Sequence, residues 1–176
     1  YRVHSATGEV AEADAIVVAA GGWLPALLGE LSLPSAFLDQ FPALEVRQEQ
    51  AYHFPYREAE DAGTDADPWP TFIFKSRELQ TYGLPGGRDA DWRGQKVAQF
   101  NGGKVIDSAL GQDGVVDAAN RRALVAYAEA FLPGVEPEPY AETTCLFTTT
   151  PTEDFVIDRV DNLVVVSACS GHGGKF

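Results

Sequence analysis

The sequence has little of what several common functional classes require. Its 13 lysines and arginines face 26 aspartates and glutamates, which gives a formal net charge of −13 at pH 7. No basic stripe is left to neutralise phosphates, so we expect neither a nucleic-acid nor a membrane partner. No apolar run approaches the roughly 20 residues that span a bilayer, and the first residues lack the basic-then-apolar pattern of a secretion signal. We therefore expect a soluble, cytoplasmic protein whose partner is a small molecule.

Cysteine and histidine are also scarce. The two cysteines, Cys145 and Cys169, are too few to staple a domain of this size, which favours free thiols in a reducing compartment. Three scattered histidines and two distant cysteines provide no metal-ligand spacing, so no metal site is predicted. The serines lack the nucleophile-elbow pattern of hydrolases. Each thiol therefore needs an explanation of its own.

The chain does contain enough apolar residues for a core, because 45% of its 176 residues are hydrophobic. A continuous apolar run at residues 15–20 predicts a strand buried on both faces, and residues 23–29 after a glycine pair predict a short helix. From residue 45 to 84 the apolar period changes to two, which indicates antiparallel sheet. Within that region, the acidic stretch 58–67 has no large apolar residue and is assigned to a solvated loop.

The second half of the chain continues this mixture of strands and helices. Residues 94–100 predict another strand, and residues 118–131 predict an amphipathic helix that ends before Pro133 and covers the sheet. Further short strands are predicted at residues 140–147, 155–157 and 163–166. The pattern as a whole predicts an α+β fold.

Three stretches carry a family resemblance when they are taken together. They are ADAIVVAAGGW at 13–23, GQKV at 94–97 with NGG at 101–103, and CLFTTTPTEDFVID at 145–158 followed by SGHGGKF at 170–176. In this order and at these separations they resemble the sarcosine oxidase and N-methyltryptophan oxidase family, which consists of FAD-dependent amine oxidoreductases of the D-amino-acid oxidase superfamily. The last pair is the most specific of the three.

The resemblance implies a two-domain oxidase of which this chain is a piece. Residues 1–40 and 141–176 would supply some strands of a Rossmann-like FAD-binding domain. Residues 41–140 would form a substrate domain with a mixed, largely antiparallel sheet and helices on one face. Neither a G-x-G-x-x-G phosphate loop nor the segment that bears the family's carboxylate-binding arginine is present. We expect the chain to be inactive alone and the full-length protein to be a monomer.

The resemblance also implies roles for individual residues. Cys145 would form a thioether to the 8α carbon of the flavin, and Lys96 would promote the reaction of reduced flavin with oxygen. Lys175 would pair with the substrate carboxylate, and His172 would lie beside the flavin ring and the substrate. The remaining predicted cofactor-binding residues lie in glycine turns or close to the cysteine, and they are Gly21, Gly22, Trp23, Phe147, Gly171, Gly173 and Gly174.

Two positions depart from the family pattern. Phe147 stands where a tyrosine is common, and Gly174 stands where most members have an aromatic residue. A lost phenol hydroxyl and a smaller side chain would alter the substrate pocket, so the preferred amine stays open. Tyr82 and Phe100, together with Trp23, are further candidates to line this pocket.

Simpler interpretations of the same residues also stay open. Taken alone, Cys145 suits a buried structural thiol, and we assign Cys169 to that role. Lys96 suits an outward lysine on an edge strand, Lys175 a solvated lysine, and His172 a hydrogen-bonded part of the scaffold.

The leading hypothesis is an oxidase of secondary amines such as sarcosine or another N-methyl amino acid. The amine passes a hydride equivalent to FAD, the imine hydrolyses, and molecular oxygen regenerates the flavin and releases hydrogen peroxide. Two alternatives remain. One is a related D-amino-acid or glycine oxidase, or a dehydrogenase, with non-covalent FAD. The other is a catalytically silent binding domain.

Overall fold

The structure is a computed structural model and describes residues 1–57, 70–167 and 169–173. The predicted loop at 58–67, Gly174 and Lys175 lie outside the described residues. The chain divides into two compact units, each of which is built from separate stretches of sequence. Unit 1 comprises Tyr1–Val46, Val105–Gln112 and Leu146–Phe176, and unit 2 comprises Arg47–Lys104 and Asp113–Cys145.

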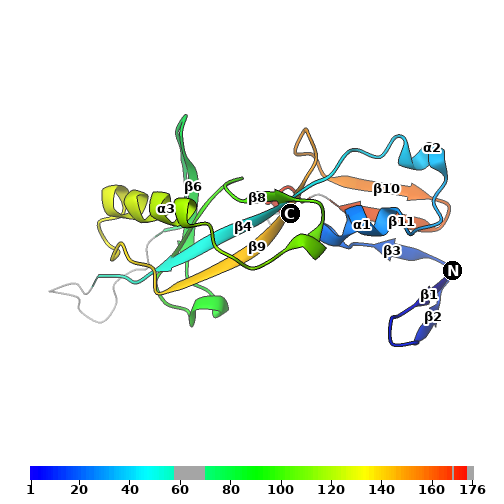
Figure 1. The fold of residues 1–176 in the computed structure, drawn as a ribbon, viewed down its shortest axis with the longest axis horizontal. Helices are drawn as coiled ribbons and strands as arrows, with labels where there is room; N and C mark the ends of the chain where they lie inside the picture. Colours follow the sequence, from blue (N-terminus) through cyan, green and yellow to red (C-terminus); the bar gives the residue numbers. More distant parts are fainter. Residues whose placement is uncertain (58–69, 168, 174–176) are drawn as a thin grey trace. The chain divides into compact units, whose positions relative to one another are not determined.

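Most strands of unit 2 belong to one largely antiparallel sheet (Figure 1). The strand order is β5-β6-β7-β4-β8, and β9 pairs with β4 beside this path. In the register, Lys96 of β7 lies opposite His53 of β4 on one side and Leu84 of β6 on the other. The strands are β4 (Glu45–Phe54), β5 (Phe72–Lys75), β6 (Gln80–Pro85), β7 (Gln95–Gln99), β8 (Lys104–Ile106) and β9 (Ala141–Thr149).

Helix α3 (Ala118–Phe131) covers one face of this sheet. The Asp117 carboxylate caps the helix by accepting hydrogen bonds from the Ala119 and Asn120 amides. The core between helix and sheet comprises Tyr52, Phe54, Val97, Leu124, Tyr127, Ala128, Leu132 and Val135. Side chains alternate between the two faces of a strand, so Lys96 and its cross-strand partner His53 lie on the face away from α3.

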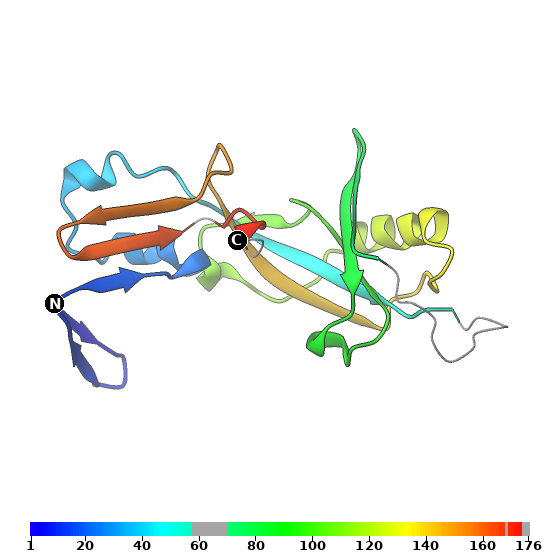
Figure 2. The same ribbon diagram turned by 180° about the vertical axis from the view of Figure 1, so that it is seen from behind.

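Unit 1 contains a three-stranded sheet with the order β10-β11-β3 (Figure 2). Strands β10 (Val156–Val160) and β11 (Leu163–Ser167) are antiparallel, and β11 is parallel to β3 (Ile16–Val18). Helices α1 (Leu24–Leu28) and α2 (Ser35–Leu38) follow β3. One face is covered by an apolar cluster centred on Val18, Leu24, Leu163 and Val165, with Leu27, Leu28 and Phe37 packed against it.

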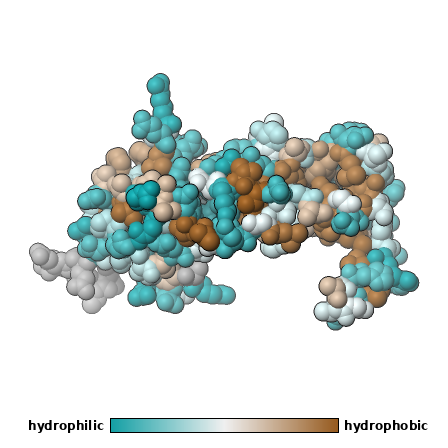
Figure 3. All heavy atoms as spheres, viewed as in Figure 1, coloured by the Kyte–Doolittle hydropathy of each residue, from teal (hydrophilic) through white to brown (hydrophobic). Residues whose placement is uncertain are grey.

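The other face of this sheet exposes apolar side chains. Val17 is 65% exposed and Ile157 is 72% exposed. The expectation that the strand at 15–20 is buried on both faces is therefore wrong for the described residues, because the helices pack on one side of it only. Figure 3 shows apolar side chains gathered on the side of unit 1 that carries α1, which is the covered face of the sheet.

The remaining elements are short. A hairpin of β1 (Arg2–His4) and β2 (Val10–Glu12) precedes β3, and 3₁₀ turns are present at η1 (Gly21–Trp23), η2 (Arg88–Ala90) and η3 (Ala109–Gly111). None of the helices in the described part of the chain has the length and apolarity that a bilayer-crossing helix needs. The combination of helices with mixed, mostly antiparallel sheets confirms the predicted α+β class.

Candidate functional site

Unit 1 contains an apolar pocket with a volume of about 520 Å³. Four residues of the sequence prediction, Gly21, Gly22, Trp23 and Gly173, line it. A Cβ built on Gly21 would meet no atom within 4 Å, whereas one built on Gly173 would lie 2.6 Å from the Cβ of Cys169. The other lining residues come from the end of β3, from β9, β10 and β11, and from the segments beside them, and they are Ala19, Leu146, Thr148, Phe155, Ile157, Val166, Ser167 and Cys169.

Two predicted glycines occupy backbone conformations or spaces that other residues would not tolerate. Gly21 has a φ of +51°, which lies in the left-handed region. Gly171 has a φ of +69°, and a Cβ built on it would lie 2.4 Å from Cε2 of Phe147. Phe147 therefore packs against the turn, and its ring is not part of the pocket lining.

Backbone hydrogen bonds hold the turn that carries His172. The amides of His172 and Gly173 both donate to the Cys169 carbonyl at 2.9 Å, and the Ser170 amide donates to the Thr148 carbonyl at 3.0 Å. The imidazole Nε2 lies 3.1 Å from the carbonyl of Glu153. A carbonyl only accepts, so this contact requires the tautomer with a proton on Nε2. The imidazole is thus hydrogen-bonded to the scaffold, and a role at a ligand stays a prediction.

The pocket region fits a flat cofactor with polar edges. The hydroxyls of Ser167 and Ser170 are buried and have no hydrogen-bond partner, and Ser167 lines the pocket. Few buried hydroxyls lack a hydrogen-bond partner, and those that do often mark a place where a water or ligand atom binds. Apolar walls and a hydroxyl that needs a partner suit a flat ring with polar edges, such as that of a flavin.

A second group of predicted site residues lies in unit 2, on the face of the sheet away from α3. Lys96 is half-buried on β7, and Cys145 is half-buried on β9. Burial raises the pKa of the Cys145 thiol, the charge of Glu49 raises it further, and the Lys96 ammonium acts in the opposite direction. Burial, then the charges of Cys145 and Glu49, raise the pKa of Tyr82 to about 12. The structure thus brings Cys145, Lys96 and Tyr82 into one electrostatic group.

Glu49 is the member of this group that the sequence did not indicate. Its side chain is 1% exposed, although it is a carboxylate in the middle of β4. Oε2 accepts hydrogen bonds from the Gly102 and Gly103 amides at 3.1 and 3.0 Å. Burial raises the pKa of Glu49, and the two backbone hydrogen bonds and the Arg47 charge oppose that rise. The only signal in the sequence is the glycine pair Gly102 and Gly103 between β7 and β8, because backbone amides in such a turn need an acceptor.

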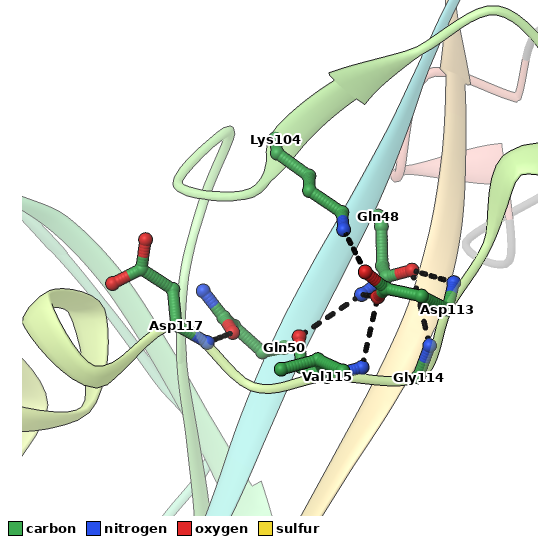
Figure 4. A network of polar contacts seen from close by, with 7 residues as sticks. All are labelled: Gln48, Gln50, Lys104, Asp113, Gly114, Val115 and Asp117. Carbon is green, nitrogen blue, oxygen red and sulfur yellow. Dashed lines mark hydrogen bonds and ion pairs between the residues drawn. The ribbon is translucent and has the colours of Figure 1, made fainter.

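The residues on either side of Glu49 anchor the segment that leads into α3 (Figure 4). The Gln48 side chain binds the loop at Asp113, Gly114 and Val115 through both its amide nitrogen and its amide oxygen. Gln50 Oε1 accepts from the Asp117 amide, and Lys104 pairs with Asp113. This network contains no predicted site residue, and its role is to hold the loop on β4.

Cys169 differs from the expected buried structural thiol. It is exposed and lines the pocket of unit 1, because β11 ends before the residue and delivers it into a turn. Among the described residues no set of three or more histidine, cysteine, aspartate or glutamate side chains is placed to hold a metal ion.

Comparison with known proteins identifies the family. A family model described as FAD dependent oxidoreductase matches residues 1–176. The chain is 31% identical over 178 aligned residues to N-methyl-L-tryptophan oxidases of Yersinia pestis and Yersinia pseudotuberculosis, with 93% of this chain and 40% of each relative covered. It thus spans about 40% of the length of these relatives.

Solved structures show the same fold at lower identity. NikD, an unusual amino acid oxidase essential for nikkomycin biosynthesis, matches with a TM-score of 0.67 and 20% identity over 95% of this chain and 42% of its own. Iminodiacetate oxidase from Chelativorans matches with a TM-score of 0.65 and 17% identity over 97% of this chain and 41% of its own. The chain belongs to the FAD-dependent oxidoreductase family, in agreement with the resemblance seen in its sequence.

Proposed function

We propose that the full-length protein is an FAD-dependent oxidase of secondary amines, with sarcosine or another N-methyl amino acid as substrate. The products are an imine, which hydrolyses to an aldehyde and an amine, and hydrogen peroxide. Family membership and the 31% identity to N-methyl-L-tryptophan oxidases support this proposal. The observation that carries it is that the half-buried Lys96 and Cys145, to which the resemblance assigns roles at the flavin, lie on β7 and β9, which both pair with β4.

The chemistry divides between cofactor and protein. FAD, when bound, supplies the hydride acceptor. Cys145 provides the sulfur for a covalent thioether, for which the thiolate is the reactive form. Lys96 opposes the rise in the thiol's pKa, and a fixed ammonium stabilises negative charge that develops on oxygen during reoxidation. Lys175 and His172 are assigned to the substrate carboxylate and the flavin edge. The activity belongs to the full-length protein, and we propose that residues 1–176 are inactive alone.

The experiment is a denaturing gel of the full-length protein, soaked in acid and viewed for flavin fluorescence. We expect a fluorescent band from the wild type and none from Cys145→Ser, because only a covalent bond survives denaturation. Cys169→Ser is the matched control and keeps the band. A band that persists in Cys145→Ser would refute the attachment site. Purified yellow protein without any fluorescent band would favour the related oxidase with non-covalent FAD.

Activity is measured separately, as oxygen consumption with sarcosine and N-methyltryptophan. In the Lys96→Met variant we expect anaerobic reduction of the flavin by substrate to persist, and reoxidation by oxygen to slow by roughly two orders of magnitude or more, the loss typical of a removed electrostatic stabiliser. Unchanged reoxidation would contradict the role of Lys96.

A further inference from the structure

Glu49 is a buried ionisable group with half of its hydrogen-bonding capacity unused. Oε2 is held by the Gly102 and Gly103 amides, whereas Oε1 is buried and has no hydrogen-bond partner. An unused buried carboxylate oxygen costs desolvation free energy without a compensating bond. A neutral glutamine at this position would also accept hydrogen bonds from the glycine amides, without the cost of burying a charge, so that cost indicates that the charge has a use.

The strand order places Glu49 beside the two groups of the proposed chemistry. Strand β4, which carries Glu49, lies between β9, which carries Cys145, and β7, which carries Lys96. The β4–β7 register pairs His53 with Lys96 and Ala51 with Ala98, and residues two apart on a strand share a face. Glu49 therefore projects from the same face as Lys96.

The charged groups around the Cys145 thiol come from three strands. Glu49 on β4 opposes its ionisation, Lys96 on β7 favours it, and Tyr82 on β6 stays neutral at physiological pH because its own pKa is raised to about 12. Arg47, also on β4, acts on Glu49 and donates to the Gly103 carbonyl at 3.0 Å. His53 lies on the same face of β4, opposite Lys96.

We propose that Glu49 is a positioning residue that keeps Cys145 in its thiol form. Its carboxylate is fixed by the glycine amides and buried from water, so its charge is poorly screened and opposes a second negative charge nearby. Only the proton of the thiol is involved, and it is released to solvent when the thiolate forms. The thiolate is the form that would attach to the flavin, so by keeping Cys145 protonated Glu49 would slow that attachment. This consequence rests on the proposed function.

The test measures the thiol itself and needs no flavin. Full-length protein from riboflavin-limited cells is treated with iodoacetamide between pH 6 and 10, and modification of Cys145 is followed by peptide-resolved mass spectrometry. For the wild type, we expect the midpoint of the rate profile above about 8.5, the value for an unperturbed cysteine. A wild-type midpoint at or below that value would overturn the proposal without any variant.

Variants test the source of the effect. Glu49→Gln keeps an acceptor for the Gly102 and Gly103 amides and removes the charge. We expect its profile to move to lower pH, with alkylation at pH 7.5 faster by roughly threefold or more. Lys96→Gln should move the profile to higher pH. Glu142→Gln is the matched control, because it removes a carboxylate from Cys145's own strand that does not act on the thiol, and its profile should match the wild type.

The outcomes separate this proposal from the proposed function. A Glu49→Gln profile that overlays the wild type, or moves to higher pH, would show that Glu49 does not hold the thiol. Glu49→Asn is the second variant if the glutamine protein does not fold, since its side-chain amide is also neutral and offers an acceptor to the glycine amides. The gel test of Cys145 can fail while the alkylation profiles still shift, and the reverse also holds.

Discussion

Gln48 provides the sharpest test of how the sheet of unit 2 holds the loop before α3. Its side chain is 3% exposed. Nε2 donates to Asp113 Oδ1 at 2.9 Å and to the Val115 carbonyl at 3.1 Å, while Oε1 accepts from the Asp113 amide at 2.9 Å and the Gly114 amide at 3.4 Å. Gln48→Ala removes all of these bonds and leaves the segment held on β4 through Gln50.

The magnitude follows from the three shorter bonds, because the 3.4 Å contact is long for a hydrogen bond. At about 0.5–1.5 kcal/mol net for each bond, their loss costs roughly 1.5–4.5 kcal/mol. The loop residues Asp113 and Val115 are exposed, so water replaces part of what they lose. We therefore expect the lower half of the range, about 1.5–3 kcal/mol.

The assay is hydrogen exchange of the peptide that covers the loop, with urea unfolding as the global measurement. Gln50→Ala is the matched control, because Gln50 is also buried on β4 but accepts a single bond from the Asp117 amide. We expect about a third of the Gln48 effect from it. A loss below about 0.5 kcal/mol for Gln48→Ala, or equal losses for both variants, would refute the anchoring role.

Two further predictions concern the turn at Gly171 and the start of α3. Gly171→Ala should destabilise unit 1 far more than Gly8→Ala in a thermal melt. Both glycines have a positive φ, but only Gly171 has the Phe147 ring where a Cβ would lie; equal shifts would contradict this reasoning. Asp117→Asn should lower the free energy of unfolding only above acidic pH, because hydrogen bonds from the Asn120 and Ala119 amides lower the pKa of Asp117. The stabilisation is present above its unfolded pKa of about 3.9 and disappears as pH falls through the folded value. A variant deficit that persists at pH 2 would show a different cause.

The elements with strong periodicity were predictable from the sequence. The period-two run at 45–54 is β4, and the helical pattern at 118–131 is α3, because each buries one face against the same core. Strand β6 was not identified individually, because Gly83 and Pro85 interrupt its pattern. Gly83 is required there by its neighbour, since a Cβ would lie 2.2 Å from the Phe72 ring on β5.

Motifs in the sequence point to residues that line the pocket of unit 1, but they do not reveal groups whose burial depends on distant parts of the chain. Gly21, Gly22, Trp23 and Gly173 line this pocket, and their role at a cofactor stays a prediction. Glu49 could not be found, because an acidic residue on an alternating strand normally faces water. The glycine amides that bind its carboxylate lie 53 and 54 positions further along the chain. Cys169 was assigned to the core for a similar reason, since the end of β11 is not visible in composition.

The ion pair between Lys104 and Asp113 has a consequence for engineering. These are the last residue of unit 2 before the segment Val105–Gln112 and the first residue after it. The Lys104–Asp113 ion pair and the hydrogen bonds of Gln48 to Asp113 hold the two ends of this segment close together. The neck of this segment is therefore closed, so residues inserted at its exposed Leu110 add little loop-closure entropy. Leu110 thus offers a natural point for grafting a foreign segment, whereas excision would also remove the end of β8 and the buried Ala109.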